Sequence, residues 1–137
     1  MITLRKKVAA NTQLMNCRPE DATNDAVRIV SVEMDVVTVG KVNPYYREQM
    51  PAYGVIVQKY TPTRCLVQTS GPLSLSGSSS LNPGRVCFVG VDGRLTATPP
   101  VATASPSSYV IVQNMGLATT PTKLDFSPDT QTLEIVL

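Results

Sequence analysis

The sequence of 137 residues contains no histidine, and this absence narrows the chemistry that the chain can perform. Histidine is the commonest general base, so neither a Ser-His-Asp nor a Cys-His catalytic arrangement can be built. The three cysteines, Cys17, Cys65 and Cys87, show no C-x-x-C spacing, and an ordinary Cys/His zinc site would lack half of its usual ligands. The sequence therefore predicts no zinc site and none of the common catalytic triads.

The remaining polar side chains offer little for catalysis either. Glu33 and Asp35 stand two residues apart and share one strand face, a pattern that fits a solvated edge better than a catalytic pair. The glycines separate strands rather than opening a helix around a phosphate, and no EF-hand spacing is present. We predict that the protein is not an enzyme and has no catalytic, cofactor-binding or metal-binding residues.

Dense charge and long apolar runs are both scarce. The formal net charge of +2 is mild for a protein that binds phosphates along nucleic acid, which usually carries a concentrated basic face. No apolar run approaches the roughly 20 residues of a membrane span, and no signal-peptide core follows the first residues. The sequence thus predicts neither nucleic acid nor a membrane as a direct partner. The cysteines are expected to be buried free thiols, which favours a reducing compartment.

The one dense basic run is Arg5, Lys6 and Lys7, near the start of the chain. It has two interpretations: a solvated terminal segment, or a basic arm that docks on an acidic neighbour. The surrounding residues mix charge, Asn, Thr and Pro without clear periodicity. We therefore assign residues 1–25 to an extended N-terminal arm and residues 26–137 to a β-rich body.

The body carries the patterns of short strands and turns. Aromatic residues make up only 5% of the chain, so the core must be mostly aliphatic. Asp92 and Gly93 predict a type I′ turn between two strands, whereas Gly71 and Pro72 are expected to break a strand. Residues 43–50 are predicted to be a loop or one helical turn. Strand patterns occupy residues 27–39, 52–60, 64–69, 86–91, 94–96, 109–115, 123–126 and 132–136.

These strands predict an all-β fold in one domain, either a single β-sandwich or a partly closed barrel. The run Val-Ile-Val-Gln occurs twice, at residues 55–58 and 110–113, and each copy is typical of a strand covered on both faces. Two explanations remain open. Buried strands draw on few residue types, or the chain contains two similar β-subunits packed face to face.

Side chains typical of protein contacts gather between residues 45 and 50. Tyr, Arg and Met are enriched at interfaces, and Tyr45, Tyr46, Arg47 and Met50 bring all three types together. The same residues could instead cap one end of the core. Together with the basic run of the arm, they are our candidate interface residues.

The order of motifs resembles a group of small structural proteins of tailed bacteriophages, found among capsid decoration (cement) proteins and related virion proteins. The motifs are residues 50–59 (MPAYGVIVQK), 65–71 (CLVQTSG), 81–90 (LNPGRVCFVG), 92–96 (DGRLT) with Pro99 and Pro100, and 112–118 (VQNMGLA) with Lys123 and Leu124. They cover a little more than half of the chain. Each motif alone is a strand or turn pattern, and their order carries the resemblance.

The resemblance implies a viral structural protein on the outside of a phage head. Such a decoration protein, often a homotrimer, would bind the major capsid protein and stabilise contacts between its subunits, and it would be located in the virion. One alternative is a tail or head fibre or spike component with receptor-facing loops at residues 76–80 and 99–108. The other is a small ligand-binding β-barrel, against which the scarcity of aromatic residues argues.

Overall fold

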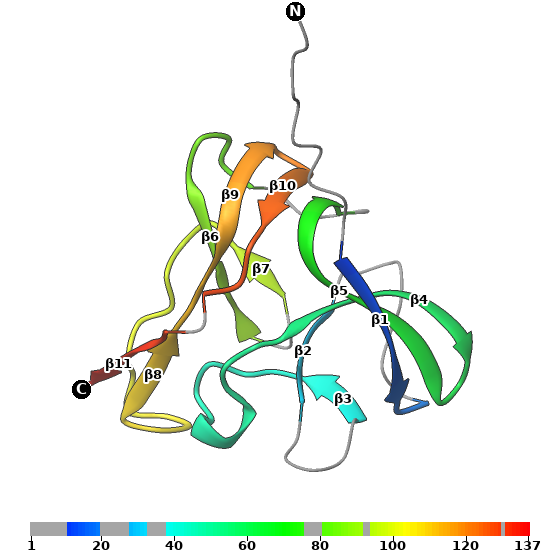
Figure 1. Cartoon of the computed structure of the whole chain (residues 1–137). Coiled ribbons are helices and arrows are strands. Elements are labelled where there is room, and N and C mark those ends of the chain that lie inside the picture. The colour runs from blue at the N-terminus through cyan, green and yellow to red at the C-terminus, as the bar shows by residue number, and fades with distance from the viewer. Residues whose placement is uncertain (1–10, 20–27, 33–37, 76–80, 92–93, 130) are drawn as a thin grey trace, which may run out of the picture.

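The protein is built almost entirely of β-strands, as predicted (Figure 1). The computed structural model describes the chain apart from residues 1–10, 20–27, 33–37, 76–80, 92–93 and 130. The described part contains eleven strands, one short 3-10 turn and no α-helix. The 3-10 turn η1 (Arg47–Gln49) confirms the single helical turn expected between residues 43 and 50.

The strands form one large sheet and one small one. In chain order they are β1 (Asn11–Cys17), β2 (Arg28–Val32), β3 (Thr38–Lys41), β4 (Gly54–Thr61), β5 (Arg64–Ser74), β6 (Val86–Val89), β7 (Leu95–Thr96), β8 (Tyr109–Val112), β9 (Asn114–Thr120), β10 (Lys123–Phe126) and β11 (Leu133–Val136). The large sheet has the order β1-β3-β2-β4-β5-β10-β9-β6-β7, and β8 and β11 pair separately.

Strands β1 to β5 return on themselves and form a partly closed barrel, which we call the β1–β5 ring. β1 pairs with β5 along most of its length, from Asn11 to Asn16. On its other side β1 pairs in parallel with β3, but only through Asn16 with Thr38 and Cys17 with Val39. In Figure 1 the sheet of β10, β9, β6 and β7 lies above and to the left of this ring.

The long strand β5 belongs to both halves of the large sheet. Its first part pairs with β4 and β1, and from Gly71 to Ser74 it pairs with β10. The prediction that Gly71 and Pro72 break the strand is wrong, because Phe126 and Asp125 lie opposite them in the ladder. Gly71 has a φ of 102°, which only glycine adopts readily, and it redirects β5 from one partner to the next.

The segment assigned to an N-terminal arm contains a strand of the body. Residues 1–10 and 20–25 lie outside the described residues, but between them β1 is paired on both sides. Its side chains at Met15 and Cys17 are buried while their neighbours are exposed. The structure therefore differs from the sequence assignment at residues 11–17, where a short alternation within a polar segment forms a strand.

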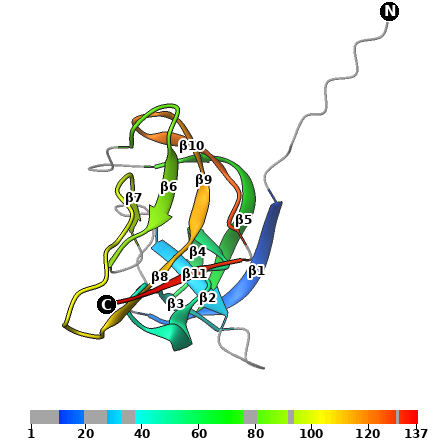
Figure 2. The same ribbon diagram turned by 90° about the vertical axis from the view of Figure 1, so that its left-hand side faces the viewer.

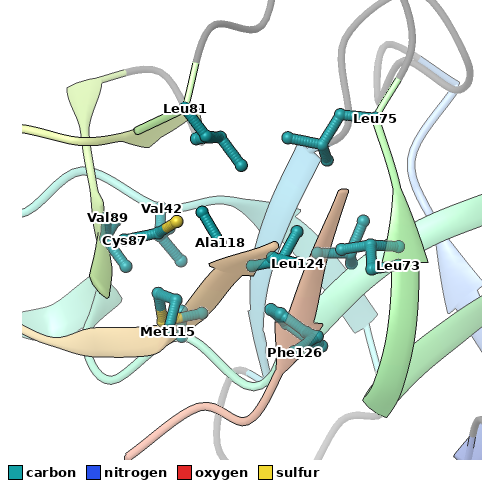
Figure 3. Packing of buried hydrophobic residues seen from close by; sticks show 12 residues of the cluster. Val42, Leu73, Leu75, Leu81, Cys87, Val89, Met115, Ala118, Leu124 and Phe126 are labelled. Atoms are coloured by element: carbon teal, nitrogen blue, oxygen red, sulfur yellow. The ribbon is translucent and has the colours of Figure 1, made fainter. Parts of the chain in front are cut away.

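Two apolar clusters form the core. The smaller one fills the β1–β5 ring with Met15, Cys17, Ile56, Cys65 and Val67. The larger one lies between β5 and the sheet of β10, β9 and β6 (Figure 3). Its members are Val42, Ala52, Val55, Leu73, Leu75, Leu81, Cys87, Val89, Met115, Ala118, Leu124 and Phe126. The largest side chains are aliphatic apart from Phe126, as the scarcity of aromatics predicts.

All three cysteines are buried and free, which confirms the prediction of buried thiols. Burial raises the pKa of the Cys87 thiol above its ordinary value. Because the thiolate is the reactive form, this shift lowers the fraction of reactive Cys87 at neutral pH.

Two predicted strand regions pair as expected, with one change of boundary. β6 and β7 pair through Phe88 with Thr96 and Val89 with Leu95, although the turn residues 92–93 between them lie outside the described part. The strand predicted over residues 109–115 is divided in two at Gln113, which ends β8 and precedes β9. The side chain of Gln113 is buried at this point and bonds to other segments, as described below.

Candidate interaction surface

The predicted interface residues fall into two groups. The basic run of Arg5, Lys6 and Lys7 lies outside the described residues. The second group lies at and around η1, at the end of the molecule that also carries β8 and β11. In Figure 2, turned so that this end faces the viewer, β8 and β11 cross in front of the ring.

The four side chains around η1 have different environments. Met50 is half-buried and packs against the larger core cluster, so it serves the fold. Tyr45 is also half-buried, and its hydroxyl donates a hydrogen bond of 2.8 Å to the backbone oxygen of Val101. Tyr46 and Arg47 are exposed. Met50 thus supports the core, and Tyr46 and Arg47 face outward, while a contact with a partner at this segment stays a prediction.

Arg47 joins η1 to both strands of the small sheet. Its guanidinium lies over the ring of Tyr109, 3.8 Å from the ring centroid, and its Nε donates a hydrogen bond to the Glu134 carboxylate. Its backbone N–H donates to the Tyr109 hydroxyl at 3.1 Å. The hydrogen bond to Glu134 raises the pKa of Arg47 above its ordinary value. Arg47 thereby fixes β11, through Glu134, and β8, through Tyr109.

The most exposed apolar surface of the described part is β11 and the residue after it. We call residues 133–137 the β11 edge. Leu133 is 62% exposed, Ile135 40%, Val136 64% and Leu137 71%. Within the described residues β11 pairs only with β8, which leaves its outer edge unpaired. The sequence analysis identified this strand but not its exposure, because an alternating or continuous apolar run looks the same whether it is covered or not.

The buried side chain of Gln113 ties this end of the molecule to the core. It is 1% exposed, and its Oε1 accepts a hydrogen bond of 2.7 Å from the Ala52 N–H. Its Nε2 donates to the backbone oxygens of Ala52, at 3.0 Å, and Asp129, at 2.8 Å. These three bonds, which we call the Gln113 bridge, use both N–H donors of the buried amide and one of the two lone pairs of its oxygen. Sequence analysis placed Gln113 in a strand and missed this role.

A shallow surface groove of about 440 Å³ lies beside β9 and includes Asn114, the residue after Gln113. Asn114, Leu117, Ser127, Pro128 and Asp129 contribute to its walls. Asn114 uses its side-chain oxygen to accept from the Gly116 N–H at 2.9 Å, and Asp129 accepts from the Gln131 N–H at 3.0 Å. These polar groups therefore support local turns of the chain.

Two absences apply to the described residues alone: a metal-binding cluster and a membrane-spanning helix. Among them, no group of three or more His, Cys, Asp or Glu side chains could hold a metal ion. No helix among them is long and apolar enough to cross a membrane.

No protein-family model matches the chain, and no curated protein matches it. The site therefore has to be interpreted from its own geometry.

Proposed function

We propose that this protein is a capsid decoration protein of a tailed phage, which binds the outside of the head and stabilises contacts between major capsid subunits. The proposal rests on the order of motifs along residues 50–126. It includes the expectations that the chain is not an enzyme and that it assembles as a homotrimer in the virion.

The observation that best supports a binding role is the exposed surface around η1 and the β11 edge. Tyr46, Arg47 and the apolar residues of the edge lie at one end of the molecule, over a rigid β-body. A decoration protein needs such a surface because it acts by burying area across subunit joints, multiplied over many copies.

The proposal is tested by binding to purified heads of the parent phage that lack the protein. We expect saturable binding of the native chain and a higher temperature of head disruption once it is bound. Deletion of residues 1–20 removes the basic run but also all of β1, so the sharper variant is the triple change Arg5→Ala, Lys6→Ala and Lys7→Ala. Reduced occupancy of this variant supports a role of the arm, whereas unchanged occupancy rules that role out.

The copy number per virion separates decoration from the fibre or spike alternative. A decoration protein approaches the stoichiometry of the capsid lattice, and fibres are far fewer. Quantitative mass spectrometry against the major capsid protein gives this ratio directly. A copy number far below the lattice would refute the decoration role and leave the fibre role.

A further inference from the structure

The β11 edge has the properties of a strand that another strand covers. Natural sheets protect exposed edges with Lys, Pro or bulges, and residues 133–137 contain none of these. The single charge in the edge, Glu134, is already engaged by Arg47. The remaining side chains are apolar and exposed.

The register with β8 defines which backbone groups are free. Leu133, Ile135 and Leu137 lie opposite Val112, Val110 and Ser108, and the Leu137 N–H donates to the Ser108 oxygen at 2.7 Å. In an antiparallel ladder the hydrogen-bonded pairs alternate, so the odd-numbered residues of the edge use their backbone groups toward β8. The N–H and C=O groups of Glu134 and Val136 therefore point away from β8, toward the open side.

We infer that the β11 edge pairs antiparallel with the same edge of a second copy of this chain, about a two-fold axis at Ile135. In this register Glu134 and Val136 of one copy exchange hydrogen bonds with Val136 and Glu134 of the other. Ile135 lies opposite Ile135 of the second copy, as a non-hydrogen-bonded pair between these two hydrogen-bonded pairs. The two-stranded sheet of β8 and β11 becomes a continuous four-stranded sheet across the two copies.

Hydrogen bonds and charge together favour this register. A two-fold axis at Val136 would leave only the Val136 self-pair hydrogen-bonded within the edge, whereas the axis at Ile135 gives two such pairs. A two-fold axis at Glu134 would place two carboxylates directly opposite each other, which destabilises a strand pair. With the axis at Ile135, each Glu134 faces Val136 of the second copy, and the odd-numbered residues form one row of Leu and Ile side chains. A self-complementary patch of this kind is what a two-fold contact requires.

The inferred contact is independent of the proposed attachment to a capsid, and it differs from the three-fold association that the phage resemblance implies. A strand of five residues contributes less area than a standard interface, so covalent trapping is a better readout than purification as a stable dimer. The change Ile135→Cys places a thiol on the axis, where facing Cα atoms are about 4.5 Å apart, within the range of a disulfide.

Leu133→Cys is the matched control. Position 133 is exposed and apolar like position 135, but in the inferred register its two copies are about 14 Å apart along the strand, beyond the reach of a disulfide. The native cysteines are buried and serve as the background. Thermal unfolding of each variant checks that the fold is kept.

Mild oxidation followed by non-reducing electrophoresis measures the covalent dimer. We expect the Ile135→Cys dimer to form on the order of tenfold faster than the Leu133→Cys dimer, because only the first pair satisfies disulfide geometry. Equal rates at the two positions, or a faster reaction at position 133, would overturn the two-fold contact. Neither result bears on capsid binding, which is measured separately.

Discussion

The run Val-Ile-Val-Gln occurs in β4 and in β8, and the two copies end in opposite environments. Val55 and Val110 are both fully buried, and Ile56 and Ile111 are both nearly so. The fourth residue differs, because Gln58 is exposed and Gln113 is buried.

The surroundings explain the difference. β4 continues beyond Gln58 as a strand that pairs with β5. β8 ends at Val112, and Gln113 turns its amide toward Ala52 and Asp129. Identical local sequence therefore fixes the apolar positions, whereas the role of the polar residue depends on distant backbone groups. The two copies also differ in their pairing, which disagrees with the hypothesis of two similar β-subunits.

The largest effect is expected for Gln113→Leu. The change keeps a similar volume but leaves the buried N–H and C=O of Ala52 without their partner. We expect the free energy of unfolding to fall by about 2–4 kcal/mol, as for buried backbone groups that lose their hydrogen bonds. Urea unfolding monitored by circular dichroism measures the change.

Gln58→Leu is the matched control for the same substitution in the other copy. Gln58 is exposed, so the free energy of unfolding should change by no more than about 0.5 kcal/mol. Equal losses for Gln58→Leu and Gln113→Leu would contradict the structural role assigned to the Gln113 bridge.

An intermediate effect, equal in the two copies, is expected for Ile56→Val and Ile111→Val. Each change removes one buried methylene group, and each should lower the free energy of unfolding by about 1 kcal/mol. The pair of urea midpoints tests whether the two apolar positions are equivalent. A loss confined to Ile56 would show that β8 contributes little to the core.

The smallest effect is expected for Arg47→Lys, which concerns β8 and has no counterpart at β4. Lysine keeps the charge but loses the planar stacking on Tyr109 and the fixed geometry toward Glu134. Because the pair is exposed, we expect exchange of the Leu137 amide hydrogen to become only roughly twofold to fivefold faster. The Ile56 amide in β4 is the internal reference and should not change. Salt should accelerate the native Leu137 exchange in the same direction.

Local patterns predicted the fold where the partners are close in sequence. β4 and β5 are joined at residues 61–64, and alternating β-branched residues on both sides of that short connection made both strands visible. Prediction failed where a distant group decides the outcome. Gln113 is bonded to Ala52, which lies 61 residues earlier in the chain. Strand β5 continues through Gly71 because β10, about fifty residues later, pairs with its second part.

The interaction surface was predictable in part for the same reason. Tyr46 and Arg47 stand out as interface residue types in a segment that lacks strand character. The exposure of Leu133 and Val136 depends on what packs over β11, which a single strand pattern does not encode. Arg47 connects the predicted residues around η1 to β11, because its partner Glu134 lies in that strand. The sequence predicted β11 as a strand but not as part of a surface.

The position of β5 in both halves of the sheet has a consequence for the order of events during synthesis. Its partner β4 is adjacent in the chain, but the other two partners are distant. Leu14 of β1 pairs with Leu66, and Leu124 of β10 pairs with Leu73, and about fifty residues separate the members of each pair. A chain emerging from the ribosome can complete the β4–β5 hairpin and the pairing with β1 early. Residues 71–74 of β5 stay unpaired with β10 until β10 has been synthesised. We therefore expect the β1–β5 ring to form before the sheet of β10, β9, β6 and β7.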